Sequence, residues 1–171
     1  TQSAEYTLNY MYSYVYDIVM SQSRVGLTEA LTDQLKYGSY NYNALAFIPS
    51  EMAYGDATTL SASYVDAYMG YWSTWYSAIR QVNQGISELK QYGQMADEDK
   101  VRLEAELRFM RAFIYFDLVK RYKEVVIYDE DLSKITKDKA LNTEAEGWDF
   151  IQADLEFAGN NLPERAASKG R

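Results

Sequence analysis

The segment between Tyr37 and Ala62 carries the side chains best suited to ligand chemistry. Gly, Pro, Ser and Asn interrupt it, and it shows no sustained period, which predicts a long loop. Loops beyond about 12 to 15 residues in compact domains are uncommon and often functional. A sugar ring can lay its C–H face on an aromatic ring while amides bond its hydroxyls. We therefore select as candidate ligand-binding residues Tyr40, Asn41, Tyr42, Asn43, Phe47 and Tyr54.

A purely structural interpretation of these rings remains open. Together with Tyr37, they could turn inward and hold a long loop against neighbouring helices. The two interpretations differ in one observable feature. A binding surface would present the rings on one concave exposed face, whereas a structural role would bury them.

Two acidic clusters could in principle supply catalytic or cation-binding carboxylates: Asp97-Glu98-Asp99 and Asp129-Glu130-Asp131. A glycosidase needs two carboxyl groups flanking a cleft. The first cluster is explained as a helix start, with Asp97 as the capping residue. The second lacks the D-x-D-x-D-G spacing of a calcium loop. The chain has no His and no Cys, and it contains no zinc, nucleophile or phosphate-loop motif. We expect a non-enzyme without cofactor or metal.

Composition narrows the possible partners. The 171 residues are 47% hydrophobic and 25% charged, enough for one sizeable core. A net charge of -8 argues against binding to nucleic acid or to anionic lipid. No apolar run approaches the ~20 residues of a membrane span. Because the chain begins at Thr1 without a secretory segment, we expect either the product of proteolytic processing or a sequence shortened for expression.

Helical periodicity predicts the elements that would position these residues. Apolar residues recur at steps of three and four in four long segments. The turn between the second and third of these segments is short, which predicts an antiparallel hairpin. Ser63 with Asp66, and Thr143 with Glu146, have the spacing of capping boxes, and Gly93 fits a helix end. The predicted long helices cover residues 3–21, 64–92, 98–122 and 144–162, with a short helix over 27–36.

The third long helix has an unusually wide apolar surface. Leu103, Leu107, Met110, Ile114 and Leu118 form its main stripe. Three phenylalanines widen the stripe around the helix, which predicts burial between other helices. The fourth helix is also expected to have a buried face. Across the third and fourth helices, the additional expected core residues are Phe109, Phe113, Phe116, Trp148, Ile151, Leu155, Ala158 and Leu162.

Several polar and aromatic residues are better explained by packing than by ligand binding. Glu104 precedes Arg108 by one turn, as Asp117 precedes Arg121, so pairing within the helix is expected. Arg111 could bind an anion, but the same kind of pairing is the favoured explanation. Asn83 borders an apolar stripe and is expected to be hydrogen-bonded in the core. Trp72, Trp75 and Tyr76 have core spacing and are expected to pack inside.

Three motifs in order resemble a known family. The first is W-x-x-x-Y-x-x-I-x-x-x-N from Trp72 to Asn83, and the second is E-x-R-F-M-R-A-F-x-Y-F-D-L from Glu106 to Leu118. The third spans Thr143 to Pro163, with Trp148, Ile151, Asp154, Leu155, Ala158, Leu162 and Pro163 matching. Together they resemble the SusD-like (RagB/SusD) outer-membrane glycan-binding lipoproteins of Bacteroidetes. The chain departs from the family's usual Gly-Asp-Val-Pro turn, because Lys123-Glu124-Val125-Val126 stands there.

The resemblance implies an all-α fold of tetratricopeptide-like antiparallel hairpins with a long irregular aromatic loop. It also implies non-catalytic oligosaccharide binding for nutrient uptake, with a SusC-like TonB-dependent transporter as partner. The parent would be lipid-anchored at the outer membrane and face outward from the cell. Because family members are several times longer, residues 1–171 would form one α-helical unit, an N-terminal portion; a short paralogue is the alternative.

Two other function classes are compatible with the sequence. A helical protein–protein interaction scaffold without sugar binding in this portion is the main alternative. An acid hydrolase using Asp and Glu alone is less favoured. The tyrosine-rich first helix, with Tyr6, Tyr10, Tyr14 and Tyr16, is one surface on which a partner could dock.

Overall fold

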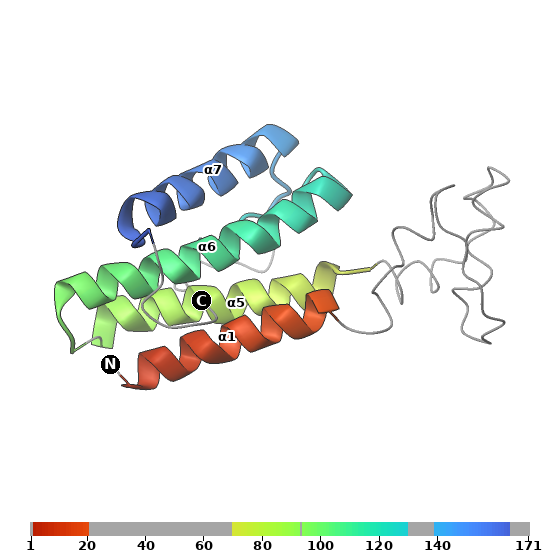
Figure 1. Ribbon diagram of the computed structural model, residues 1–171. Helices are drawn as coiled ribbons and strands as arrows, with labels where there is room; N and C mark the ends of the chain where they lie inside the picture. Colours follow the sequence, from red (N-terminus) through yellow and green to blue (C-terminus); the bar gives the residue numbers. More distant parts are fainter. Residues whose placement is uncertain (1, 21–69, 93, 130–138, 165–171) are drawn as a thin grey trace, which may run out of the picture. The chain divides into compact units, whose positions relative to one another are not determined.

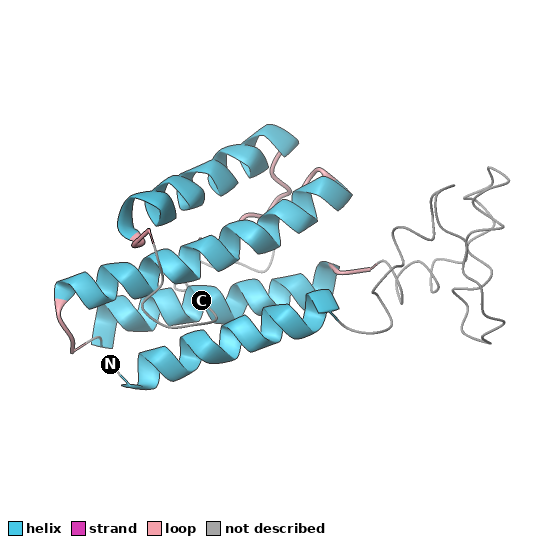
Figure 2. Ribbon diagram, in the orientation of Figure 1, coloured by secondary structure: helices cyan, strands magenta, loops and turns pink. Residues whose placement is uncertain are grey.

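The computed structural model describes residues 2–20, 70–92, 94–129 and 139–164. These residues form four helices, labelled α1 (Gln2–Met20), α5 (Trp72–Tyr92), α6 (Asp97–Tyr122) and α7 (Glu144–Asn161), as Figure 1 shows. Within the same residues no strand forms, and one isolated bridge joins Val125 to Asn142 (Figure 2). The predicted all-α class is confirmed. None of the described helices is both long enough and apolar enough to cross a membrane.

The chain divides into two compact units, residues 1–15 with 72–171 and residues 16–71. The predicted 27–36 helix and the aromatic loop both fall in the second unit, outside the described residues. The candidate ligand-binding residues are all in that loop. Gly93 also lies outside them. The account below therefore concerns the first unit.

Helices α5 and α6 form the predicted antiparallel hairpin. Contacts along the pair run in opposite directions: Trp75 of α5 bonds Asp117 of α6, and Lys90 pairs with Glu104. The apolar stripe of α5 is buried as its spacing predicts. Its buried members are Trp75, Ala78, Ile79, Val82, Ile86 and Leu89. Trp72 and Tyr76 are half-buried, with ring centroids 4.7 Å apart.

Helix α7 packs antiparallel on the side of α6 away from α5 (Figure 1). The predicted capping box is present at its start: the Glu146 backbone N–H donates to the Thr143 hydroxyl at 3.3 Å, and the Thr143 N–H donates to the Glu146 carboxylate at 2.8 Å. Gly147, Ile151 and Ala158 are buried. The capping box sets the register at which α7 begins.

Helix α1 contacts α6 through its first half. Leu8 and Met11 are fully buried. The Tyr12 hydroxyl donates to Glu106 of α6 at 3.1 Å, and the guanidinium of Arg102 pairs with Glu5. Helix α1 is therefore held by apolar burial and by polar contacts along its edge.

Two predicted helix starts need correction. Gly70 and Tyr71 are not helical, so the predicted continuous helix from residue 64 is wrong and α5 begins at Trp72. Glycine loses more backbone entropy in a helix than other residues, which favours a break there. Asp97 is the first helical residue rather than the cap; Ala96 holds the capping position and makes no side-chain bond. The acidic first turn still complements the helix dipole.

The prediction that additional large apolar residues of α6 and α7 are buried is wrong. Phe109, Phe113 and Phe116 of α6 are exposed, as are Trp148 and Leu155 of α7. Helices α5 and α7 pack on α6, but they leave these five side chains 37–44% exposed. The main stripe from Leu103 to Leu118 is buried as predicted.

The backbone has an unusual conformation just after α6, where the sequence departs from the family's usual turn. Lys123 has φ 62° and ψ -68°, and the Glu124 N–H donates to the Tyr122 carbonyl at 2.8 Å. This is a γ-turn with positive φ at its centre, a strained conformation for a residue with a Cβ. Lys123 is the one non-glycine residue with positive φ in the described part of the chain.

The two described glycines of α7 predict opposite effects of alanine. A Cβ at Gly147 would lie 2.8 Å from Cγ2 of Val119, a stiff and fully buried side chain. At Gly159 nothing lies within 4 Å. We expect Gly147→Ala to lower the free energy of unfolding by about 1 to 3 kcal/mol through overpacking. Gly159→Ala should be neutral or stabilising by up to about 1 kcal/mol. Urea unfolding measures both, and equal effects would contradict this packing.

Candidate functional site

The six candidate ligand-binding residues, Tyr40, Asn41, Tyr42, Asn43, Phe47 and Tyr54, lie outside the described residues. Their arrangement therefore stays a prediction. The described helices contain two other groups of side chains with functional potential. One is a network of buried polar residues, and the other is a set of exposed aromatic residues.

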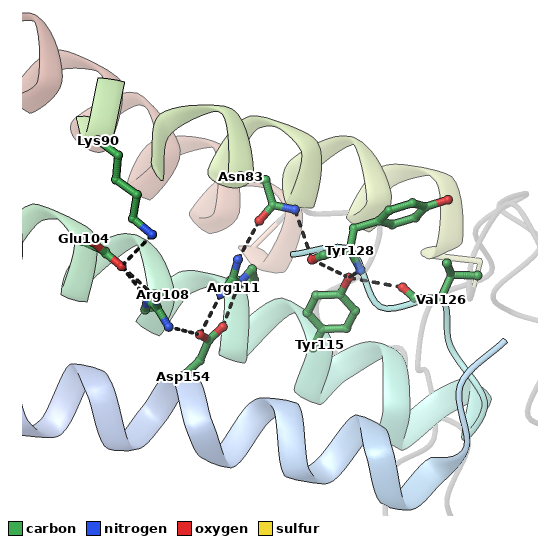
Figure 3. Close-up of polar contacts among 9 residues, drawn as sticks. All are labelled: Asn83, Lys90, Glu104, Arg108, Arg111, Tyr115, Val126, Tyr128 and Asp154. Carbon is green, nitrogen blue, oxygen red and sulfur yellow. Dashed lines mark hydrogen bonds and ion pairs between the residues drawn. The ribbon is translucent and has the colours of Figure 1, made fainter. Parts of the chain in front are cut away.

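The buried network centres on Arg111 of α6. Its Nε and one Nη donate to the two oxygens of Asp154 on α7, at 2.7 and 2.8 Å. The other Nη donates to Asn83 of α5 at 2.8 Å (Figure 3). All three residues are at most 1% exposed. One guanidinium thus joins three helices in a bidentate, charge-assisted arrangement.

A second arginine extends the network toward solvent. Arg108 is bonded to Glu104 one turn earlier at 2.8 Å, as predicted, and reaches Asp154 at 3.4 Å. Glu104 also accepts the more exposed Lys90 at 3.5 Å (Figure 3). The guanidinium of Arg108 lies 4.2 Å from the ring centroid of Phe157, a cation–π distance. Two guanidinium groups therefore compensate the buried carboxylate of Asp154.

A separate polar cluster joins the other end of the hairpin. The Trp75 indole N–H donates to Asp117 at 2.8 Å, and Arg121 donates to the same carboxylate oxygen at 2.8 Å, the predicted pairing within the helix. Lys120 pairs with the other oxygen at 3.2 Å. Burial opposes ionisation of Asp117, but these bonds outweigh it and lower the pKa of the carboxyl group. Asp117 is therefore a charged anchor in the hairpin.

The segment after α6 is held without helix or sheet. The Val125 N–H and carbonyl exchange bonds with the backbone of Asn142, at 3.2 and 2.7 Å. The Asn142 side chain accepts the Ile127 N–H at 3.1 Å, and Lys139 donates to the Ile127 carbonyl. These contacts satisfy alternate backbone groups of residues 125–128.

Tyrosine hydroxyls satisfy the remaining groups of that segment. Tyr76 accepts the Val126 N–H at 2.7 Å and donates to the Val126 carbonyl at 2.9 Å. Tyr115 accepts the Tyr128 N–H at 2.8 Å, and Asn83 donates to the Tyr128 carbonyl at 3.1 Å (Figure 3). Burial raises the pKa of both hydroxyls far above the usual value for tyrosine, so they remain neutral donors and acceptors.

This polar interior positions helices rather than offering a ligand site. The described partners of Arg111, Asp154 and Asn83 are protein groups, and all three are buried from solvent. The expectation that Asn83 is a bonded core residue is confirmed. The favoured pairing of Arg111 within its own helix is wrong, because its carboxylate partner lies 43 positions away. The spacing within one helix could not reveal Asp154.

Exposed tyrosines give α1 a surface of a different kind. Tyr6 and Tyr10 are one turn apart on one side of α1, and each is more than half exposed. The rings of Tyr10 and Tyr14 are stacked, with centroids 6.0 Å apart and planes 20° apart. Tyrosine combines apolar area with a polar tip and is enriched at interfaces. This face therefore has the chemistry of a protein-contact surface.

The acidic clusters do not assemble a metal site within the described ranges. No group of three or more Asp or Glu residues there is arranged to hold a metal ion. Asp129 is described and exposed, whereas Glu130 and Asp131 lie outside those ranges.

Comparison with known families and structures identifies the family of the chain. A family model described as "Starch-binding associating with outer membrane" matches residues 2–170. The chain belongs to the SusD-like family. A SusD-like protein of Bacteroides ovatus is 27% identical over 146 residues, which cover 77% of this chain and 27% of that protein.

Solved structures of SusD-like proteins have the same fold. A SusD-like protein from Bacteroides fragilis is 25% identical, with a TM-score of 0.74 over 98% of this chain and 30% of its own. A laminarin-binding SusD-like protein is 21% identical, with a TM-score of 0.74 over 95% of this chain and 34% of its own. A structure described with xylogluco-oligosaccharide gives a TM-score of 0.66 at 21% identity, over 99% of this chain and 31% of its own. This chain thus spans about a third or less of the length of the proteins that it matches.

The first site prediction concerns the buried ion pair. Arg111→Met or Asp154→Leu alone should lower the free energy of unfolding by about 3 to 5 kcal/mol, because each leaves a buried charge without its partner. The double variant should lose far less than the sum of the two. The control is Asp97→Ala, which removes the exposed Asp97–Lys100 pair. It should lower the free energy of unfolding by at most about 1 kcal/mol. Urea unfolding measures all four, and additive single losses would contradict the coupling.

The second site prediction concerns acid. Because the pKa of Asp117 is lower in the folded state, its stabilising contribution is present above the unfolded value of about 3.9 and is lost as pH falls through the folded value. Asp117→Asn should therefore be less stable than the parent at pH 7. That difference should shrink steadily in urea titrations between pH 5 and pH 3. A difference that stays constant with pH would show that Asp117 contributes by packing alone.

Proposed function

We propose that this chain is part of a non-catalytic oligosaccharide-binding protein. The observation that carries the proposal is the match of residues 2–170 to a family described as starch-binding. Relatives of the same fold are described as binding laminarin or as solved with xylogluco-oligosaccharide. The chain has no His or Cys, and the buried carboxylate of Asp154 is already paired with Arg111.

The proposed ligand contacts are Tyr40, Asn41, Tyr42, Asn43, Phe47 and Tyr54. Aromatic rings provide flat apolar faces for the C–H groups of a sugar, and the amides of Asn41 and Asn43 match its hydroxyls. The described helix interior supports this assignment indirectly. Its buried polar groups already bond one another, so hydroxyl recognition is better sought in the loop than in the helical core.

The proposed setting is nutrient uptake at the outer-membrane surface. The family description associates its members with the outer membrane. We place the full-length parent on the outward-facing side of that membrane, held by a lipid anchor, with a SusC-like TonB-dependent transporter as partner. Residues 1–171 would be an N-terminal portion of this longer parent. The exposed tyrosines of α1 supply one surface suited to protein contact.

The same tyrosine face favours one alternative. A helical scaffold that binds protein but no sugar in this portion would also need an exposed aromatic helix. Tyr10, at 57% exposed, can therefore serve to separate the two functions experimentally.

The test is titration of laminarin, xyloglucan and starch oligosaccharides into the full-length protein. For the sugar that binds best, Tyr40→Ala, Tyr42→Ala and Phe47→Ala should each weaken binding by about twofold to tenfold, the loss of one stacking contact. Tyr10→Ala is the matched control on α1 and should leave the affinity unchanged. Circular dichroism checks folding of each variant.

Three outcomes would contradict the proposal. Unchanged affinity in all three loop variants would move the site away from the loop, and weaker binding in Tyr10→Ala alone would place it on α1. Release of reducing ends from the same sugars, abolished by changing one acidic residue, would make the protein an enzyme.

A further inference from the structure

The short segment of residues 125–128, which we call the strap, is held against the helical hairpin by side chains. The hydroxyl groups of Tyr76 on α5 and Tyr115 on α6 bond backbone groups of the strap. The side-chain amide of Asn83 on α5 donates to the carbonyl of Tyr128 at 3.1 Å (Figure 3). The contact between the strap and the hairpin therefore depends on individual hydrogen bonds and not on a helix or a sheet ladder.

Little apolar burial supports those hydrogen bonds. Val125 is fully buried, but Val126, Ile127 and Tyr128 are only half-buried. The strap also follows Lys123, whose φ of 62° is strained for a residue with a Cβ and can relax when the strap detaches. Segments with few buried apolar contacts open at free energies well below that of global unfolding. The strap has the features of such a segment.

Arg111 decides which end of the Asn83 amide faces the strap. A guanidinium only donates hydrogen bonds, so the amide oxygen must face it, and the two atoms are 2.8 Å apart. The amide nitrogen is then left to donate to the carbonyl of Tyr128. Turning the amide over would set donor against donor at Arg111 and acceptor against acceptor at Tyr128.

The orientation of Arg111 is set in turn by α7. Two of its nitrogens donate to the carboxylate of Asp154, at 2.7 and 2.8 Å. A planar guanidinium bound through two nitrogens has little freedom to rotate, so its third nitrogen is directed at Asn83 (Figure 3). A chain of hydrogen bonds therefore runs from α7 through α6 and α5 to the strap.

We infer that the strap opens while the helices stay folded, and that the Arg111–Asp154 ion pair keeps it closed through Asn83. A displacement of α7 that loosens the ion pair frees the Asn83 amide, and the carbonyl of Tyr128 then loses its donor. The position of α7 and the closure of the strap are thereby coupled. This conformational device is independent of the proposed sugar binding.

Hydrogen–deuterium exchange in the full-length protein tests the first half of the inference. Opening of the strap exposes little surface, so the rates of its amides should hardly change at low urea concentrations. Amides in the middle of α6 should exchange through global unfolding, and their rates should rise steeply with urea. The same urea dependence in both places would show that the strap opens only when the helices unfold.

Two arginine variants test the relay through Asn83. Arg111→Lys keeps a positive charge opposite Asp154 but loses the separate nitrogen that holds Asn83. The strap amides should then exchange about threefold to tenfold faster, the effect of losing one hydrogen bond. Arg108→Lys is the matched control, because the bonds of Arg108 in Figure 3 reach Glu104 and Asp154 rather than Asn83. It should leave exchange of the strap nearly unchanged.

Asn83→Asp is a second test that does not depend on weakening the ion pair. The carboxylate still accepts from Arg111, but it sets an oxygen against the carbonyl of Tyr128. Exchange of the strap should rise by about tenfold or more, and by a larger factor than exchange in α6. Circular dichroism checks folding, and if Arg111→Lys does not fold, Asn83→Asp decides the relay alone.

Two outcomes would overturn the relay. Equal acceleration of strap exchange by Arg111→Lys and Arg108→Lys would show that Asn83 does not transmit the state of the ion pair. The backbone contacts with Asn142, which hold the strap beside the start of α7, would then be the route. Unchanged strap exchange in Asn83→Asp would show that the orientation of the amide does not matter. None of these measurements bears on sugar affinity.

Discussion

The buried guanidinium of Arg111 is the constraint on which the arrangement of α5, α6 and α7 depends. A charge removed from water is tolerated only when an opposite charge and hydrogen bonds replace its hydration. Asp154 supplies the charge from α7, and Asn83 supplies the remaining acceptor from α5. Apolar stripes can slide or rotate at modest cost, whereas this three-helix contact is satisfied in one register. The ion pair therefore gives specificity to packing that apolar burial makes favourable.

The same logic extends to the segment that follows α6. Residues 125–128 form no helix or sheet, yet side chains of Tyr76, Tyr115 and Asn83 satisfy part of their backbone. Asn83 bonds both Arg111 and this segment, so the ion pair and the segment share one residue. The strained turn at Lys123 is held between α6 and these contacts. Tyrosine is suited to this role, because its ring packs while its hydroxyl both donates and accepts.

Functionally, the described helices are best understood as a scaffold with two aromatic surfaces. The tyrosines of α1 have polar tips and remain compatible with a wet interface. The exposed residues of α6 and α7 are almost purely apolar: Phe109, Phe113, Phe116, Trp148 and Leu155. Because the polar interior is already satisfied, we propose the aromatic loop rather than the helical core for sugar recognition.

The sequence by itself determined the four long helices apart from the start of α5, together with the antiparallel hairpin, the α7 capping box and the family. These features depend on local periodicity, short turns and contiguous motifs. It also placed Asn83 in the core and Arg108 beside Glu104. It could not pair Arg111 with Asp154, because that contact joins positions 43 apart and depends on how α7 packs. Nor could it tell that Phe109 and Trp148 are exposed, since periodicity marks a side of a helix as apolar without identifying what covers it. Only tertiary packing decides which apolar side faces a neighbour and which faces solvent.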